Sequence, residues 1–150
     1  MKKGLTEEKL IHEIFILDAN LTEIFNEYNR NEKISNMIDE MLAELNMEKL
    51  SPLVINEAVD LSAPGWTFIQ PITTSHISAH YFIETNKPSH LHFDLYSCKP
   101  FNWSTALQII DKYFKIDDWS ANFIKRDTYT RSIIEIKGNK LDIALNHILE

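Results

Sequence analysis

The chain has 150 residues, 44% hydrophobic and 25% charged, so it is large enough to bury a core as one domain without disulfide or metal support. Its 15 basic and 22 acidic residues give a net charge of -7, which disfavours nucleic acid or an anionic membrane as a partner. A single cysteine, Cys98, excludes an internal disulfide. The sequence also has no signal-peptide pattern and no apolar run of ~20 residues. Together these features predict a cytoplasmic protein.

The first third of the chain predicts a strand followed by a helix. An apolar run rich in Ile and Phe predicts the strand over Leu10–Leu17. Asn20, with Glu23 three positions later, resembles a capping box and predicts a helix start. The apolar residues that follow recur at three- and four-residue steps and define one helical face: Ile34, Met37, Ile38, Met41, Leu42 and Leu45.

The middle of the chain predicts a series of strands. Two are expected over Leu53–Val59 and, after a turn at Pro64-Gly65, over Trp66–Ile72. Two more are expected over Ser75–Phe82 and His90–Ser97. The loop between this last pair carries the turn residues of a hairpin, so the two strands are predicted to be neighbours.

The last third predicts a helix, a hairpin and a second helix. Asn102 is expected to cap the first helix, whose apolar side consists of Trp103, Ala106, Leu107, Ile110, Tyr113 and Phe114. A hairpin of Trp119–Lys125 with Tyr129–Ile136 follows, and Gly138-Asn139 leads into a helix that ends at Leu149.

Runs of neighbouring strands favour an antiparallel sheet over a doubly wound parallel one. The predicted fold is α+β: residues 1–150 form a single two-layer domain, an antiparallel sheet with helices on one face. The other face of such a sheet needs cover, which a homodimer that stacks two sheets would supply.

The most unusual residues lie in Thr73–His80 and Asp94–Cys98, where hydroxyls, imidazoles and the thiol gather. If the two strands pair as a hairpin, the start of one lies near the end of the other, so Ser75 and Cys98 are expected to share one site. Serine is also common in strands, and a lone cysteine often acts as a small buried hydrophobe. The residues themselves therefore leave a catalytic and a structural interpretation open.

The segment Ser75-His-Ile-Ser-Ala-His80 resembles the Ser-His-Ile-Ser-x-His motif of the prokaryotic pyruvoyl-dependent S-adenosylmethionine decarboxylases. Pro64-Gly65-Trp66-Thr67 is similar to the family's glycine-serine turn, and Asp94-Leu-Tyr-Ser-Cys98 to its Asp-aliphatic-aromatic-Thr-Cys segment. The resemblance covers about residues 53–127. It implies the α+β fold of that family, a homodimer with sites near its interface, and pyruvoyl-dependent decarboxylation of S-adenosylmethionine for spermidine synthesis.

The resemblance also implies how the cofactor arises. The Ser75 hydroxyl attacks the carbonyl of Thr74, and elimination then splits the chain between Thr74 and Ser75 and leaves a pyruvoyl group on the C-terminal fragment. His80 matches the histidine that serves this processing. Cys98 matches the donor that delivers a proton after carbon dioxide leaves.

Three further residues are implied in the substrate site: Thr67, at the place of a serine near the processing site, Phe82, which stacks on adenine, and Glu84, which holds the ribose. Thr74 stands where the family has a glutamate, and Leu61 where it has a second stacking aromatic. Two alternatives therefore stay open. One is a pyruvoyl decarboxylase of another amino acid, and the other is a non-processing homologue that binds a ligand or partner without catalysis.

The histidines His76, His80, His90 and His92 raise the question of a metal site. His90 and His92 alternate along a strand and so share one of its faces. No carboxylate or second cysteine completes a ligand set by pattern, so no metal is expected.

Overall fold

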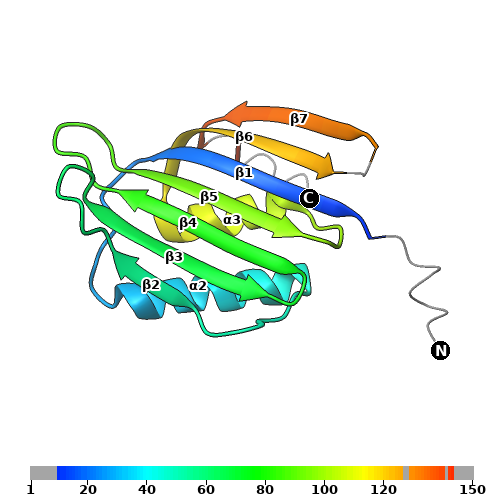
Figure 1. Ribbon diagram of the computed structural model, residues 1–150. Coiled ribbons are helices and arrows are strands. Elements are labelled where there is room, and N and C mark those ends of the chain that lie inside the picture. Colours follow the sequence, from blue (N-terminus) through cyan, green and yellow to red (C-terminus); the bar gives the residue numbers. More distant parts are fainter. Residues whose placement is uncertain (1–9, 127–128, 141, 144–150) are drawn as a thin grey trace.

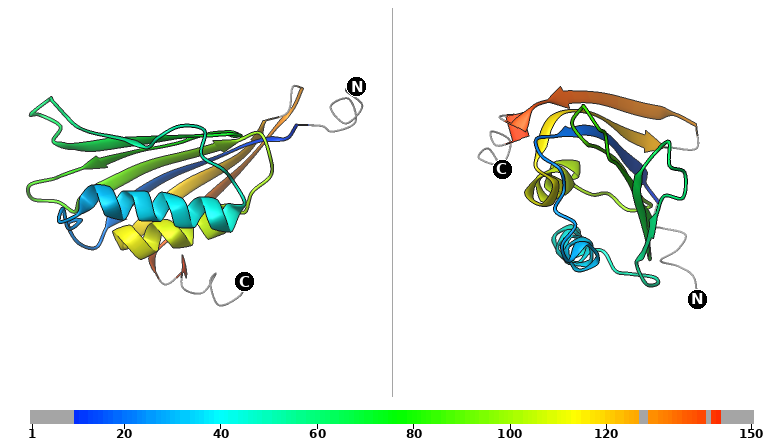
Figure 2. Two further views of the ribbon diagram at one scale, coloured as in Figure 1. Left: turned by 90° about the horizontal axis from the view of Figure 1, so that it is seen from below. Right: turned by 90° about the vertical axis from the view of Figure 1, so that its left-hand side faces the viewer.

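A computed structural model describes residues 10–126, 129–140 and 142–143. Within these residues, seven strands form one antiparallel sheet in the order β2-β3-β4-β5-β1-β6-β7, and two helices pack on one of its faces (Figures 1 and 2). The predicted α+β architecture is thereby confirmed. The elements are β1 (His12–Leu21), α2 (Arg30–Leu45), β2 (Val54–Glu57), β3 (Gly65–Ile72), β4 (Ser75–Phe82), β5 (His90–Ser97), α3 (Trp103–Phe114), β6 (Ile116–Arg126) and β7 (Arg131–Gly138).

The core lies between the sheet and the two helices. The predicted apolar face of α2 is buried at Ile34, Met37, Ile38, Met41 and Leu42, which confirms the helical stripe. Alternate residues of β4 and β5 are buried as well: Ile77, Ala79, Tyr81, Leu91, Phe93 and Leu95. The residues between them point to the other face, because side chains alternate along a strand. One sheet face is therefore apolar and covered, and the opposite face is open.

The first strand lies inside the sheet, between β5 and β6. β1 pairs with β5 on one side and with β6 on the other, although α3 separates those two strands in sequence. The register sets Asp18 opposite both His92 and Ser120. The insertion of β1 thus brings side chains from the start of the chain beside the β4–β5 hairpin.

The helix start predicted at Asn20 is wrong. Asn20 belongs to β1, and its side-chain amide donates to the Asp118 carboxylate at 3.1 Å. The strand runs past the short apolar segment because partners on both sides continue to bond its backbone. Helix α2 begins only at Arg30, after Asn29 in the left-handed conformation with φ 55°.

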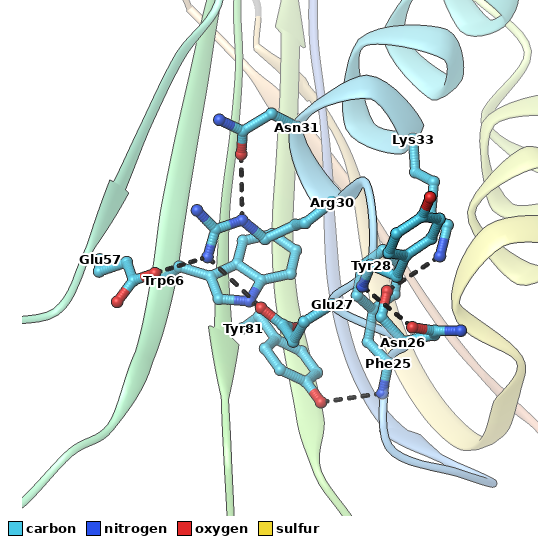
Figure 3. A network of polar contacts seen from close by, with 10 residues as sticks. All are labelled: Phe25, Asn26, Glu27, Tyr28, Arg30, Asn31, Lys33, Glu57, Trp66 and Tyr81. Carbon is cyan, nitrogen blue, oxygen red and sulfur yellow. Dashed lines mark hydrogen bonds and ion pairs between the residues drawn. The ribbon is translucent and has the colours of Figure 1, made fainter.

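Side-chain contacts link the connection from β1 to α2 with the sheet, and Figure 3 shows them from close by. The Phe25 N–H donates to the Tyr81 hydroxyl at 3.0 Å, and Trp66 Nε1 donates to Glu27 at 3.1 Å. The Arg30 guanidinium lies over the Trp66 ring, 5.3 Å from its centroid. A buried aromatic pair of the sheet therefore anchors the loop that the sequence pattern assigned to a helix.

The remaining elements agree with the sequence to within a few residues. β4 and β5 have the predicted bounds and pair as a hairpin. The Asn102 side chain caps α3 by accepting from the Ser104 N–H, as predicted. β2 is shorter than predicted, β6 begins earlier, at Ile116, and most of the helix expected to end at Leu149 lies outside the described residues. Among the helices that the structure describes, none has the length and apolar character needed to cross a membrane.

Candidate active site

The open face of the sheet carries the polar side chains singled out by the sequence. On β4 and β5 it presents the residues that alternate with the buried ones, His76, Ser78, His80 and Phe82 on one strand and His90, His92, Asp94 and Tyr96 on the other. Every histidine that the structure describes lies on this face, since His12 of β1 also alternates with buried neighbours. The ionisable groups thus gather where no helix covers the sheet.

Ser75 begins β4 directly after the turn that joins it to β3. Its φ of 150° lies in a region that residues with a side chain rarely adopt. The preceding carbonyl, that of Thr74, accepts the Cys98 N–H at 2.9 Å, and the Thr74 hydroxyl accepts the Ser97 hydroxyl at 3.1 Å. Thr74, whose carbonyl belongs to the peptide bond before Ser75, is therefore held by the last residue of β5 and by the residue that follows it.

The strain at Ser75 gives a measurable stability effect. Ser75→Gly should melt about 2–4 °C above Ser75→Ala, because glycine adopts this φ without the cost of about 1 kcal/mol that a Cβ brings. Neither variant has a hydroxyl for self-cleavage, so calorimetry compares two intact chains. The same pair of substitutions at Ser78, in the regular part of β4, should reverse the order. Equal melting temperatures for the two Ser75 variants would show that the position is unstrained.

Thr67 and His80 face each other across β3 and β4. The two residues are register partners, and Thr67 Oγ1 lies 2.7 Å from His80 Nδ1. His80 is five residues along β4 from Ser75, about 16 Å at 3.3 Å per residue. One chain therefore brings His80 to Thr67 but keeps both away from Ser75.

Phe82 ends β4, seven residues or about 23 Å from Ser75, and Glu84 follows it in the β4–β5 loop. The Phe82 ring stacks on His90 with centroids 5.1 Å apart, and Glu84 Oε1 lies 2.9 Å from His90 Nε2. Glu84 and His90 line an open cavity of about 710 Å³. Leu61, in the loop before β3, is 92% exposed.

A second cluster, near Ser75, was not found by sequence reasoning. The His12 Nδ1 atom lies 2.6 Å from the Tyr96 hydroxyl, and the Arg126 guanidinium lies 4.9 Å from the Tyr96 ring centroid. His76, the neighbour of Ser75, meets the same ring edge-on at 5.7 Å. The cluster carried no sequence signal, because His12 and Arg126 come from strands whose long-range pairing no local pattern specifies.

Asp94 is the carboxylate of the open face whose proton affinity is most clearly changed. Burial raises the pKa of Asp94 above its ordinary value, and repulsion from Asp18 adds to the rise. The nearby imidazoles of His76, His80 and His92 act in the opposite direction. Asp94 therefore keeps its proton to a higher pH than an exposed aspartate, and in that form it can donate a hydrogen bond to a ligand on this face.

The structure is thus an α+β domain with a strained serine at the turn between β3 and β4 and with a row of imidazoles on its uncovered sheet face. A sequence model of the family described as S-adenosylmethionine decarboxylase matches residues 17–127. The chain therefore belongs to the S-adenosylmethionine decarboxylase family, which is a family of decarboxylases with a small-molecule substrate. No curated protein sequence matches the chain. The matched range contains all seven predicted site residues: Thr67, Thr74, Ser75, His80, Phe82, Glu84 and Cys98.

Proposed function

We propose that the chain is a pyruvoyl-dependent decarboxylase of S-adenosylmethionine in spermidine synthesis, and that it makes its own cofactor by cleavage between Thr74 and Ser75. The observation that carries the proposal is the backbone at this bond. Ser75 has a φ of 150°, and the carbonyl before it is fixed by the Cys98 N–H at 2.9 Å. Release of backbone strain on cleavage would favour the reaction.

The residues at this bond suit the formation of a pyruvoyl group. Serine offers a hydroxyl that can attack the Thr74 carbonyl and later be eliminated. The Cys98 N–H polarises that carbonyl and would stabilise the negative charge on its oxygen during attack. An ester bond replaces the amide bond, elimination frees the Thr74 carboxylate, and water then displaces the nitrogen of residue 75 as ammonia. Threonine in place of glutamate leaves these steps intact, since they use only its carbonyl.

The protein's own side chains would then bind the substrate and move protons. A pyruvoyl group at residue 75 would supply a carbonyl that can bind the substrate amine and withdraw electrons, the chemistry that pyridoxal phosphate supplies in other enzymes. His80, held through Nδ1 by Thr67, has its other nitrogen available to take the Cα proton of residue 75 during processing. Cys98 would supply a proton after carbon dioxide leaves. Phe82 would stack on the purine ring, and Glu84 would accept hydrogen bonds from ribose hydroxyls.

We further propose that the active unit is a homodimer. Ser75 and Phe82 lie about 23 Å apart on one strand, which is too far for one substrate molecule to contact both. A twofold axis near the middle of β4 would stack two open faces and bring the Ser75 end of β4 in one copy to the His80–Phe82 end of β4 in the other. Stacking would also cover the sheet face that the helices leave open.

Mixing two inactive variants tests the shared site. Ser75→Ala and His80→Ala should each fail to cleave, whereas co-expression should produce cleavage of the His80→Ala chain alone, because it keeps Ser75 and receives His80 from its partner. About half of randomly formed dimers are mixed and hold one complete site, so decarboxylation should reach about a quarter of the wild-type value. Two different tags identify the cleaved chain on a gel. An uncleaved mixture, or a monomer by light scattering, would contradict the shared site.

The wild-type chain itself distinguishes the proposal from its alternatives. Its intact mass should give two fragments divided before Ser75, and the protein should release labelled carbon dioxide from carboxyl-labelled S-adenosylmethionine. Cleavage with release from a different amino acid would identify another substrate, which the exposed Leu61 would suit. An uncleaved chain that releases no carbon dioxide would indicate a non-catalytic homologue.

A further inference from the structure

Four side chains on the open face form one continuous row of hydrogen bonds. Glu84 Oε1 lies 2.9 Å from His90 Nε2, and His90 Nδ1 lies 2.9 Å from His92 Nε2. His92 Nδ1 in turn contacts Asp18 Oδ1. The row joins the β4–β5 loop, β5 and the neighbouring strand β1, and its members line the same cavity.

The number of hydrogens in this row is fixed by its geometry. Three contacts need three hydrogens, yet the ionised carboxylates of Asp18 and Glu84 can only accept, and two neutral imidazoles supply only one N–H each. With those two hydrogens facing the carboxylates, His90 Nδ1 and His92 Nε2 would point lone pairs at each other across 2.9 Å. A third hydrogen removes this conflict. Because imidazole is a stronger base than carboxylate, a third hydrogen in the row would be carried by an imidazole and would leave both carboxylates ionised.

We propose that Asp18, His92 and His90 are positioning residues that share one extra proton and through it hold Glu84 and Phe82 in the geometry that binds the ligand. The assignment of Phe82 and Glu84 as nucleoside contacts rests on the proposed function, whereas the shared proton follows from the row itself. His90 is the centre of the arrangement, because it bonds Glu84 and its ring stacks on Phe82 with an interplanar angle of 17°. His92 supports the same Phe82 ring edge-on, with centroids 5.5 Å apart.

The surroundings contain charges of both signs. The ionisable groups that face the two imidazoles, besides Asp18 and Glu84, are His80 on β4, Asp94 on β5, Asp118 on β6, Lys137 on β7 and Lys87 in the β4–β5 loop. Carboxylates favour the imidazolium and the lysines oppose it. Among the described residues, no group of three or more His, Cys, Asp or Glu side chains is arranged to hold a metal.

The row is intact only while it holds three protons. At alkaline pH the third proton leaves and the central link between His90 and His92 becomes a contact of two lone pairs. At acid pH a fourth proton places two N–H groups and two positive charges against each other. Ligand binding through Glu84 and Phe82 is therefore greatest at an intermediate pH and falls on both sides.

Nitrogen-15 spectra of the histidine rings in the full chain test the shared proton without any ligand. Near neutral pH, three of the four ring nitrogens of His90 and His92 should be protonated. Asp18→Asn should lower the pH at which the third proton leaves by about 0.5 to 1 unit, because it removes the charge beside His92. Asp118→Asn is the matched control. The Asp118 carboxylate lines the same cavity but bonds Asn20 and neither imidazole, so its removal should change the pH of proton loss much less. Two imidazoles that titrate independently, or equal shifts in both variants, would overturn the shared proton.

Calorimetric titration of S-adenosylmethionine into the uncleavable Ser75→Ala chain, from pH 6 to 8.5, tests positioning. His90→Phe keeps a ring against Phe82 but loses both hydrogen bonds, and it should weaken binding about tenfold. Asp18→Asn, an exposed substitution, should move the alkaline limb of the affinity profile to lower pH. Unchanged affinity and an unchanged profile in both variants would overturn positioning. Failure of the parent Ser75→Ala chain to bind would instead overturn the proposed substrate, with the nitrogen spectra still deciding the proton.

Discussion

A Ser75→Ala chain should remain a single polypeptide of about 17.5 kDa and release no carbon dioxide from S-adenosylmethionine. Alanine has no hydroxyl to attack the Thr74 carbonyl and no oxygen to be eliminated, so neither the split nor the pyruvoyl group can form. The loss should be complete to the limit of detection, because both activities depend on this one atom. Intact-mass spectrometry and release of labelled carbon dioxide measure the two outcomes in the same preparation.

The matched control for this variant is Ser78→Ala, three residues along the same strand. Ser78 lies on the open face within the regular part of β4. Its substitution also removes a serine hydroxyl from the six-residue motif. It should leave cleavage before residue 75 intact. Decarboxylation in Ser75→Ala, or cleavage lost equally in both variants, would contradict the assignment of Ser75 as the source of the cofactor.

Local patterns predicted most of the fold because its pairings are mostly local. The turn residues before His90 and the extended segments on both sides of them predicted the bounds of β4 and β5 to the residue. The apolar stripe starting at Ile34 determined the core face of α2. Each of these signals arises from residues that are neighbours in sequence as well as in space.

The insertion of β1 between β5 and β6 could not be predicted in the same way. Its two pairings join residues about 75 and 100 positions apart, and loop-closure entropy depends little on which distant partner is chosen. The helix start expected at Asn20 was wrong for this reason, since tertiary pairing outweighed a weak capping signal. The same insertion delivers Asp18 to His92 and His12 to Tyr96, two contacts that no motif in the sequence indicated.

The motif indicates candidate reactive residues, but it does not show how these residues are distributed along the strand. The structure divides the candidates into three groups. Thr74 and Ser75 lie beside Cys98, and Thr67 contacts His80. Phe82 and Glu84 both contact His90. A motif of six residues reads as one site, yet an extended strand spreads it over about 16 Å. Strand geometry therefore separates what the sequence presents as a cluster, and a second copy is the simplest means of reuniting it.

Cys98→Ser should separate making the cofactor from using it. The Thr74 carbonyl is held by the backbone N–H of residue 98, which serine retains, so the chain should still split before Ser75. Decarboxylation should fall about 100-fold or more, because a serine hydroxyl is a far weaker acid than a thiol and proton delivery by a positioned acid contributes about 10²–10⁴-fold. Cys98→Ala, which keeps the N–H and has no acidic proton, should cleave as well and be at least as slow. Loss of cleavage in both variants would mean that the thiol acts in processing. Full turnover in Cys98→Ala would assign proton delivery to another donor. Asp94, whose pKa is raised, is the next candidate on the open face.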